Sequence, residues 1–234
     1  MVDPETSIPR HILVVADGDV ASRATLDEVW PGWAEGIAGV VAADGGYARA
    51  VACGFAPDLL VGDLDSLAPE LVLEAEASDR TRVRRSPIDK DESDTELALL
   101  EAVALGATRV TVLGAFGGPR MDHALANLWL LAHPRLATID IELIDVNARA
   151  RLIAAPGPGG DPVTRPLPGR LGAIVSLLPF GGDAEGVTTR GLRYPLRDEP
   201  LRSGPARGLS NVRTSADAAV TLRSGRLLVV EQPA

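Results

Sequence analysis

Residues 1–150 of this chain alternate short apolar runs with amphipathic stretches, and no other feature restricts the fold as much. The apolar runs are rich in Val, Ile and Leu and are often followed by Gly or Asp, a pattern typical of parallel strands covered on both faces. Strands that alternate with helices predict a doubly wound, mainly parallel α/β sheet. The expected strands are 11–16, 39–44, 58–63, 108–115 and 139–145, and the expected helices lie near 22–35, 46–53, 69–77, 94–105 and 121–132.

The pattern changes after about residue 154. The segment 155–169 is dense in Pro and Gly, which indicates a loop or linker. Beyond it no helical periodicity is found, and Ser224-Gly225 predicts a hairpin turn between two strands. We therefore expect an α/β domain over 1–150, followed by a smaller C-terminal antiparallel β-sandwich domain over 151–234. Its expected strands lie within 171–179, 184–189 and 218–232.

Composition excludes several classes of protein. The chain is 46% hydrophobic and 24% charged, which is ordinary for a globular protein, and its net charge of −9 argues against binding to nucleic acid. No apolar run is long enough for a membrane helix, and the N-terminal residues lack a signal-peptide pattern, so we expect a soluble cytoplasmic protein without membrane association. Cys53 is the only cysteine and Lys90 the only lysine, which excludes a cysteine-ligated zinc site and a Walker-type phosphate loop.

Chemistry-bearing residues follow the expected strands. Asp44-Gly45-Gly46 ends the second strand and opens a helix, an arrangement that presents backbone N–H groups to an anion or ribose. The alternative is a tight turn in which Asp44 caps that helix.

Asp63 and Asp65 follow the third strand. Residues two apart in an extended segment face the same side, so these carboxylates repel each other unless a divalent cation such as Mg²⁺ lies between them. The alternative is that one of them caps the helix near Pro69 while the other is solvated.

Two further loops complete the set. Asp89, Asp91, Glu92 and Asp94 precede a helix that Ser93 could cap, and Lys90 among them is either a phosphate contact or a countercharge. In the loop 114–122, Arg120 could grip phosphate oxygens or pair with Asp122 on the surface. All four loops fall at carboxyl ends of expected parallel strands, where ligands of open α/β sheets bind. The sequence therefore predicts a metal and phosphate site there.

These motifs, in this order, resemble the thiamine pyrophosphokinase family, and the resemblance spans nearly the whole chain. Ser93 stands where threonine is common, Pro119 lengthens the glycine loop, and Tyr194 stands where an aromatic residue, often tryptophan, is typical. The matching segments are Asp44-Gly45-Gly46, Pro57-Asp58 with 62–66, Asp91-Glu92-Ser93-Asp94, Gly114 with 117–122, and in the second domain 176–182, 186–196 and 208–213.

The resemblance implies that ATP and thiamine react to give AMP and thiamine diphosphate. It implies a catalytic group in the first domain: Asp63, Asp65 and Asp94 as the Mg²⁺ ligands, with Arg120 and Asp122 contacting phosphate and orienting the alcohol. It implies that Asp44, Gly45, Gly46, Asp91 and Ser93 bind the nucleotide and metal, and that Tyr194, Ser210 and Asn211 in the second domain bind thiamine. The alternative for Ser210 and Asn211 is a turn held by hydrogen bonds from side chain to backbone.

Other functions stay open at this point. Related folds transfer pyrophosphate to pterin alcohols, and a non-catalytic nucleotide- or thiamine-binding regulator is a second alternative. A binding protein has little reason to keep so many clustered carboxylates, which favours the enzyme. The family resemblance also implies a homodimer with shared active sites.

Overall fold

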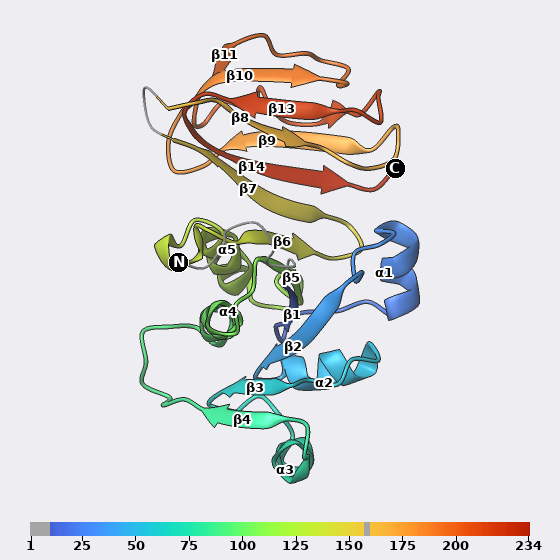
Figure 1. The fold of residues 1–234 in the computed structure, drawn as a ribbon, viewed down its shortest axis with the longest axis vertical. Coiled ribbons are helices and arrows are strands. Elements are labelled where there is room, and N and C mark those ends of the chain that lie inside the picture. The colour runs from blue at the N-terminus through green and yellow to red at the C-terminus, as the bar shows by residue number, and fades with distance from the viewer. Residues whose placement is uncertain (1–9, 157–159) are drawn as a thin grey trace, which may run out of the picture. The chain divides into compact units, whose positions relative to one another are not determined.

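A computed structural model of the chain describes residues 10–156 and 160–234 (Figure 1). The chain divides into two compact units, Met1–Val146 (unit 1) and Asn147–Ala234 (unit 2). Residues 1–9, which lack a signal-peptide pattern, and residues 157–159 of the Pro- and Gly-rich segment lie outside the described residues.

Unit 1 contains a parallel sheet with the strand order β6-β5-β1-β2-β3-β4. The chain moves outward from β1 to β4 and then returns to the other side of β1 to form β5, so the topological switch point lies between β1 and β5. Ligands of such sheets bind at the carboxyl ends of the strands near this point. The strands are β1 (His11–Val15), β2 (Ile37–Ala43), β3 (Leu59–Gly62), β4 (Arg82–Arg85), β5 (Arg109–Leu113) and β6 (Asp140–Ile144).

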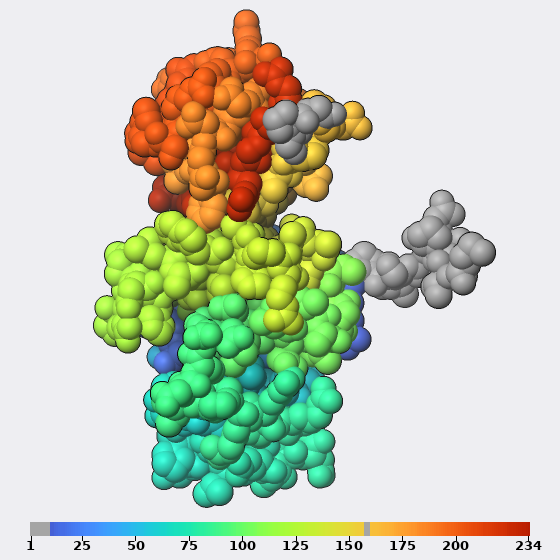
Figure 2. Space-filling view, turned by 90° about the vertical axis from the view of Figure 1, so that its left-hand side faces the viewer, coloured from blue at the N-terminus to red at the C-terminus, as the bar shows by residue number. Residues whose placement is uncertain are grey.

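Helices cover both faces of this sheet, as a doubly wound fold requires. Figure 1 shows α1 and α2 on one side and α4 and α5 on the other, and α4 and α5 lie side by side (Figure 2). None of the helices in the described part of the chain has the length and apolar character needed to cross a bilayer. The helices are α1 (Arg23–Val29), α2 (Gly46–Ala52), α3 (Pro69–Ala77), α4 (Asp94–Ala104), α5 (Met121–Leu130) and a 3₁₀ turn, η1 (Pro134–Leu136).

Strand β4 was not predicted, because its sequence is Arg-Val-Arg-Arg. It lies at the edge of the sheet and pairs only with β3 among the described strands. An edge strand has one unpaired side that can carry charged residues, and these residues discourage further strand pairing. The apolar runs that mark buried strands are therefore absent from it.

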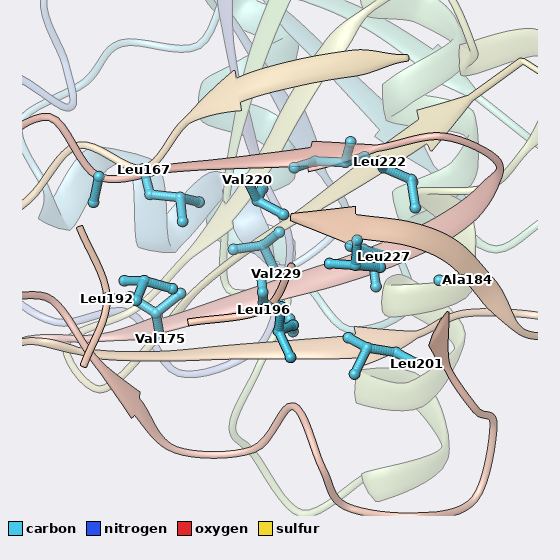
Figure 3. Packing of buried hydrophobic residues seen from close by; sticks show 14 residues of the cluster. Leu167, Val175, Ala184, Leu192, Leu196, Leu201, Val220, Leu222, Leu227 and Val229 are labelled. Atoms are coloured by element: carbon cyan, nitrogen blue, oxygen red, sulfur yellow. The ribbon is translucent and has the colours of Figure 1, made fainter. Parts of the chain in front are cut away.

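Unit 2 is an antiparallel sandwich. One sheet has the order β12-β9-β14-β7, and the other, four-stranded, has the order β11-β10-β13-β8. The core between the two sheets includes Leu167, Val175, Val220, Leu222 and Val229 (Figure 3). All five of these side chains are fully buried. The strands are β7 (Arg149–Ala155), β8 (Val163–Pro166), β9 (Ile174–Pro179), β10 (Ala184–Arg190), β11 (Glu199–Leu201), β12 (Asn211–Val212), β13 (Ala219–Leu222) and β14 (Gly225–Gln232).

Two sequence-based expectations about unit 2 were wrong. Ser224-Gly225 is not a hairpin turn between paired strands, because β13 pairs with β10 and β8 whereas β14 pairs with β7 and β9. The turn instead carries the chain from one sheet to the other. The Pro- and Gly-rich segment also contains strand β8, whose Pro166 ends the strand.

A buried polar chain crosses three strands of unit 1. The His11 ring nitrogens contact the Glu35 carbonyl oxygen at 3.0 Å and Thr111 Oγ1 at 2.9 Å. Thr111 in turn donates to Glu142 Oε1 at 3.0 Å, and Arg109 donates to the same oxygen at 2.8 Å. Burial lowers the pKa of His11, although the hydrogen bond to the Glu35 carbonyl and the charge of Glu142 act in the opposite direction.

This arrangement predicts that unit 1 loses stability as the pH falls below the ordinary histidine pKa of about 6.5. The folded protein resists protonation of His11, so the unfolded chain binds more protons, and the free energy of unfolding rises with pH by at most about 1.4 kcal/mol per pH unit. Urea unfolding followed by tryptophan fluorescence between pH 5.5 and 7.5 measures this slope, since all tryptophans lie in unit 1. The slope should shrink in His11→Asn and persist in His123→Asn, whose ring is exposed.

Candidate active site

Asp44 directly follows β2, with its backbone in the left-handed region at φ 48°. Its Oδ2 accepts a hydrogen bond from the Ser66 hydroxyl at 2.6 Å, whereas its Oδ1 is buried without a hydrogen-bond partner among the described residues. Burial raises the pKa of Asp44, and the charges of Asp94 and Asp63 raise it further. Gly45, not Asp44, is the N-cap of α2, so the alternative role of Asp44 as a helix cap is not observed.

Asp63 and Asp65 follow β3 and approach Asp44. One carboxylate oxygen from each of these residues lies within 4.8 Å of the others. Between the two, Leu64 adopts φ 67°, so the segment is not extended as expected. This conformation is uncommon outside glycine and costs backbone strain. Helix α3 is capped by Ala68 without a side-chain hydrogen bond, so neither aspartate serves as its cap.

Gly62 permits this convergence. A Cβ atom at this position would lie 3.1 Å from Asp44 Cβ and 3.2 Å from Asp94 Oδ1, and the φ of 148° is one that other residues rarely adopt. The backbone N–H of Ser86 donates to the Gly62 carbonyl at 2.9 Å, and the Ser86 hydroxyl is buried without a hydrogen-bond partner in the described residues. Unpartnered buried oxygens therefore occur on both Asp44 and Ser86, beside one glycine.

The acidic loop before α4 contributes Asp94 and Lys90. The Lys90 ammonium lies 2.9 Å from Asp94 Oδ1 and 3.7 Å from Asp63 Oδ2. Burial alone would lower the pKa of Lys90, but the hydrogen bond and charge of Asp94, together with Asp63, raise it overall. Asp91 is exposed, and the predicted cap role of Ser93 is confirmed, since its hydroxyl accepts the Glu96 N–H at 3.2 Å.

The carboxylate group suits a hard divalent cation. Oxygen ligands from Asp44, Asp63 and Asp65 are what Mg²⁺ prefers, and the unpartnered Asp44 Oδ1 is an acceptor that such an ion would satisfy. The structure thus brings Asp44 together with the predicted ligands Asp63 and Asp65. It places the third predicted ligand, Asp94, beside Lys90.

The glycine loop after β5 leads to Arg120 and Asp122. The Arg120 guanidinium donates to both Asp122 oxygens, at 2.9 and 2.6 Å, and the pair is exposed. This hydrogen bonding holds the pKa of Asp122 well below its usual range. In this structure the two residues contact each other, as the surface-pair alternative describes.

Two aspartates that the sequence analysis did not select lie in the loop after β1. Asp19 Oδ2 accepts the Gly118 N–H at 2.9 Å, so it holds the glycine loop. The Asp17 carboxylate packs so closely on Gly45 that a Cβ there would lie 2.3 Å from it, and it pairs with Arg49 at 3.8 Å. Both follow a predicted strand, and the rule applied to the other strands could have identified them.

In unit 2, Asn211 is buried and bonded to the backbone. Its Oδ1 accepts the Tyr194 N–H at 3.0 Å, and its Nδ2 donates to the Tyr194 carbonyl at 2.7 Å. The Tyr194 side chain is 59% exposed, with the Arg193 guanidinium 5.7 Å from its ring centroid. Ser210 is exposed and its backbone has φ 57°. The Asn211 amide thus holds in place the segment that presents the Tyr194 ring.

Comparison with known proteins identifies the family. A model described as thiamin pyrophosphokinase, catalytic domain, matches residues 34–143, and one described as thiamin pyrophosphokinase, vitamin B1 binding domain, matches residues 164–228. Together they cover most of the chain. The chain belongs to the thiamin pyrophosphokinase family. The thiamine pyrophosphokinase of Bacillus subtilis (strain 168) is 25% identical over 197 residues, which cover 81% of this chain and 85% of the relative.

Solved structures agree with this fold across both units. The crystal structure of the thiamine pyrophosphokinase from Bacillus subtilis superposes with a TM-score of 0.79 at 23% identity, covering 96% of this chain and 99% of that one. A thiamin pyrophosphokinase family protein from Enterococcus faecalis gives 0.74 at 28% identity, with the same coverage of both chains. The fold class expected from the sequence, and the resemblance on which the enzyme assignment depended, are therefore confirmed.

The matched segments of the thiamin pyrophosphokinase family also sort the candidate residues. The carboxylates, the glycine loop and the Arg120–Asp122 pair all lie within the stretch matched by the catalytic domain. Tyr194 and Asn211 lie within the stretch matched by the vitamin B1 binding domain. As a member of this family the chain is an enzyme, and neither the pterin nor the non-catalytic alternative gains support from the comparisons.

Proposed function

We propose that this chain transfers pyrophosphate from ATP to the hydroxyl of thiamine, giving thiamine diphosphate and AMP, at the carboxylate group of unit 1. The observation that carries the proposal is the convergence of Asp44, Asp63 and Asp65 at the carboxyl ends of β2 and β3. Enzymes that transfer phosphoryl groups depend mainly on positioning and on neutralising phosphate charge. Carboxylates that gather where strands end are suited to that task through a bound cation.

Asp63 and Asp65, with Asp44 beside them, would hold Mg²⁺. Asp94 would add a further carboxylate next to these residues, and Asp91 would lie near the metal. When bound, the ion would offset the charge of the ATP phosphates. Helix α2 begins at Gly46, and the backbone N–H groups around Gly45 and Gly46 would line the nucleotide site.

Arg120 and Asp122 would act at the phosphates and at the attacking hydroxyl. In the structure the Arg120 guanidinium is occupied by Asp122, and both side chains are exposed to incoming ligand. A planar guanidinium that binds a carboxylate through two hydrogen bonds can bind phosphate oxygens in the same way. We propose that Arg120 binds phosphate oxygens either in place of Asp122 or together with it. Asp122 is then available to orient the thiamine hydroxyl.

Thiamine would be bound by unit 2. The exposed Tyr194 ring offers a face to the cationic thiazolium, an interaction of about 0.5–2 kcal/mol. Ser210, which precedes Asn211 in the chain, would make a polar contact with thiamine. We further propose a homodimer with shared active sites. Met121 and Leu125, one turn apart on α5, expose apolar side chains of the kind that a subunit interface covers.

The reaction is tested by incubating the protein with thiamine, ATP and Mg²⁺ and separating the products by chromatography. Equal amounts of AMP and thiamine diphosphate are the expected result. Hydroxymethyl-dihydropterin serves as the control acceptor, and AMP release with it but not with thiamine would overturn the assignment. Light scattering on the same preparation measures whether the chain is dimeric.

Asn211→Ala is expected to lower the stability of unit 2 and to raise the KM for thiamine. The variant leaves the part-buried Tyr194 N–H and carbonyl without their side-chain partner, which costs up to about 1–3 kcal/mol. Tyr194 then loses its position, so the KM for thiamine rises while that for ATP does not. The matched control is Tyr194→Ala, whose exposed ring contributes little to stability, so only the KM should change. An unchanged thiamine KM in both variants would remove them from the substrate site.

A further inference from the structure

Lys90 occupies an unusual position for a lysine. It lies in the loop before α4, and its side chain is only 11% exposed. The ammonium faces two carboxylates from different segments, Asp94 at 2.9 Å and Asp63 at 3.7 Å. Lysine is rarely buried unless it is paired, so the pairing with these carboxylates accounts for its burial.

The surroundings of this ammonium carry a large excess of negative charge. Asp63 belongs to the group that also contains Asp44 and Asp65, and one ammonium does not neutralise them all. Asp44 is only 6% exposed, and its Oδ1 has no hydrogen-bond partner among the described residues. The carboxylate group of Asp44, Asp63 and Asp65 therefore keeps a net negative charge even with Lys90 in place, and a further cation could neutralise it.

The chemistry of lysine fits a cation that can be replaced. Every other basic side chain of this protein except histidine is arginine, whose planar fork binds carboxylates through two hydrogen bonds. Lysine instead ends in a single compact charge on a flexible stem and makes no such fork. A divalent cation at Asp63 and an ammonium a few ångströms away repel each other strongly.

We propose that Lys90 is a built-in counter-cation of the carboxylate group: it pairs with Asp63 and Asp94 when no metal is bound and leaves them when a divalent cation binds. The inference rests on the proposed function in taking Asp44, Asp63 and Asp65 as the cation site. It assigns Lys90 a role as a positioning residue, which keeps the repelling carboxylates together in the metal-free protein and sets how tightly the cation binds.

Because Lys90 is the only lysine, its amine can be followed in the unmodified protein. Brief reductive methylation with formaldehyde and a borane reductant, without ATP or thiamine, labels accessible amines. Cleavage at arginine then releases a peptide of residues 86–109 for mass spectrometry. Mg²⁺ alone should raise the labelling rate of Lys90 by roughly tenfold, as expected for loss of one charge-assisted hydrogen bond. The α-amino group of the chain is the internal control and should not respond.

Asp65→Asn is the matched variant for this measurement. It leaves both carboxylates that contact Lys90 in place but weakens the cation site, so labelling without Mg²⁺ should be unchanged and the effect of Mg²⁺ should largely disappear. Labelling of the wild-type protein that Mg²⁺ does not change, or that it slows, would overturn the proposal.

A second measurement follows metal binding directly. Electron paramagnetic resonance measures free Mn²⁺ and so gives the Mn²⁺ affinity of each protein in the absence of ATP. Lys90→Met should bind Mn²⁺ about tenfold more tightly than the wild type, since the cation no longer competes with an ammonium. Lys90→Arg keeps the charge and should not tighten binding. Equal Mn²⁺ affinity of Lys90→Met and the wild type would overturn the role of Lys90.

These experiments separate the inference from the proposed function. Neither requires product formation, so a protein that forms no thiamine diphosphate but releases Lys90 on adding Mg²⁺ contradicts only the proposed reaction. A protein that forms product while Lys90 labelling ignores Mg²⁺ contradicts only the Lys90 proposal. Absence of Mn²⁺ binding overturns the cation site and the Lys90 proposal together.

Discussion

Asp65→Asn is expected to lower kcat by roughly 10³-fold or more while the protein stays folded. Asparagine keeps the shape of the side chain but removes the negative charge, and a metal ion at such a site supplies several kcal/mol of charge stabilisation. Asp65 is exposed, so its replacement removes no packing from the core. The effect should therefore fall on turnover and on Mg²⁺ dependence, with the melting temperature nearly constant.

Steady-state rates of AMP release, measured over a range of Mg²⁺ concentrations, check this expectation. Asp79→Asn is the matched control, because Asp79 is also an exposed aspartate of unit 1 but lies in the connection between α3 and β4. It should retain wild-type turnover. A folded Asp65→Asn protein with near-normal kcat at saturating Mg²⁺ would remove Asp65 from the mechanism.

The choice of Asp65 illustrates what a sequence can reveal about such a site. Asp63 and Asp65 follow a run of apolar residues, and the end of a buried strand is visible from that run alone. The same reasoning selected Asp44 and the Arg120 loop as candidates. Because parallel strands end at one edge of a sheet, the sequence predicted a single region for four loops separated along the chain, and the structure brings Asp44 together with Asp63 and Asp65.

The approach of Asp44 to Asp63 and Asp65 could not be predicted. Asp44 approaches Asp63 and Asp65 because Asp44 and Leu64 both adopt positive φ, which non-glycine residues rarely do and which no sequence pattern marks. The contact between Lys90 and Asp63 likewise depends on how two loops fold over the sheet edge. Strand β4 was not predicted for a related reason: its charged residues are tolerated only because it is the edge strand of the sheet.

In unit 2 the sequence predicted strands but not how they pair. The alternation of apolar residues predicted strands, but it could not assign each strand to one of two stacked sheets, so a turn between sheets was mistaken for a hairpin. The sequence also left two roles open for Asn211, thiamine binding and hydrogen bonding to the backbone. An amide that binds thiamine and an amide that holds a neighbouring backbone have the same sequence, and only the two hydrogen bonds to Tyr194 reveal the second role.

Glu231→Ala is expected to cause the largest loss of stability in unit 2, about 3–5 kcal/mol. The Glu231 side chain is 1% exposed and accepts hydrogen bonds from three arginines. Arg149 and Arg151 donate to Oε2 at 2.9 and 2.8 Å, and Arg213 donates to Oε1. Removing the carboxylate leaves a fully buried guanidinium at Arg213 without its counter-charge. Calorimetry of the melting transition measures the loss.

The matched control is Glu199→Ala. Glu199 pairs with Arg207 in the same unit, but both side chains are partly exposed, so its loss should stay within about 1 kcal/mol. A similar small effect of Glu231→Ala would show that the buried cluster contributes no more than a surface pair.

The cause of the loss can be tested further, because Arg213 also donates from Nε to the Leu167 carbonyl at 2.9 Å and from Nη1 to the Arg170 carbonyl at 3.3 Å. Burial lowers the pKa of Arg213, which the charge of Glu231 opposes. If the uncompensated charge dominates, adding Arg213→Met to Glu231→Ala should recover part of the lost stability, since an apolar side chain of similar length needs no counter-charge. If the backbone hydrogen bonds dominate, the double variant should be less stable than either single one.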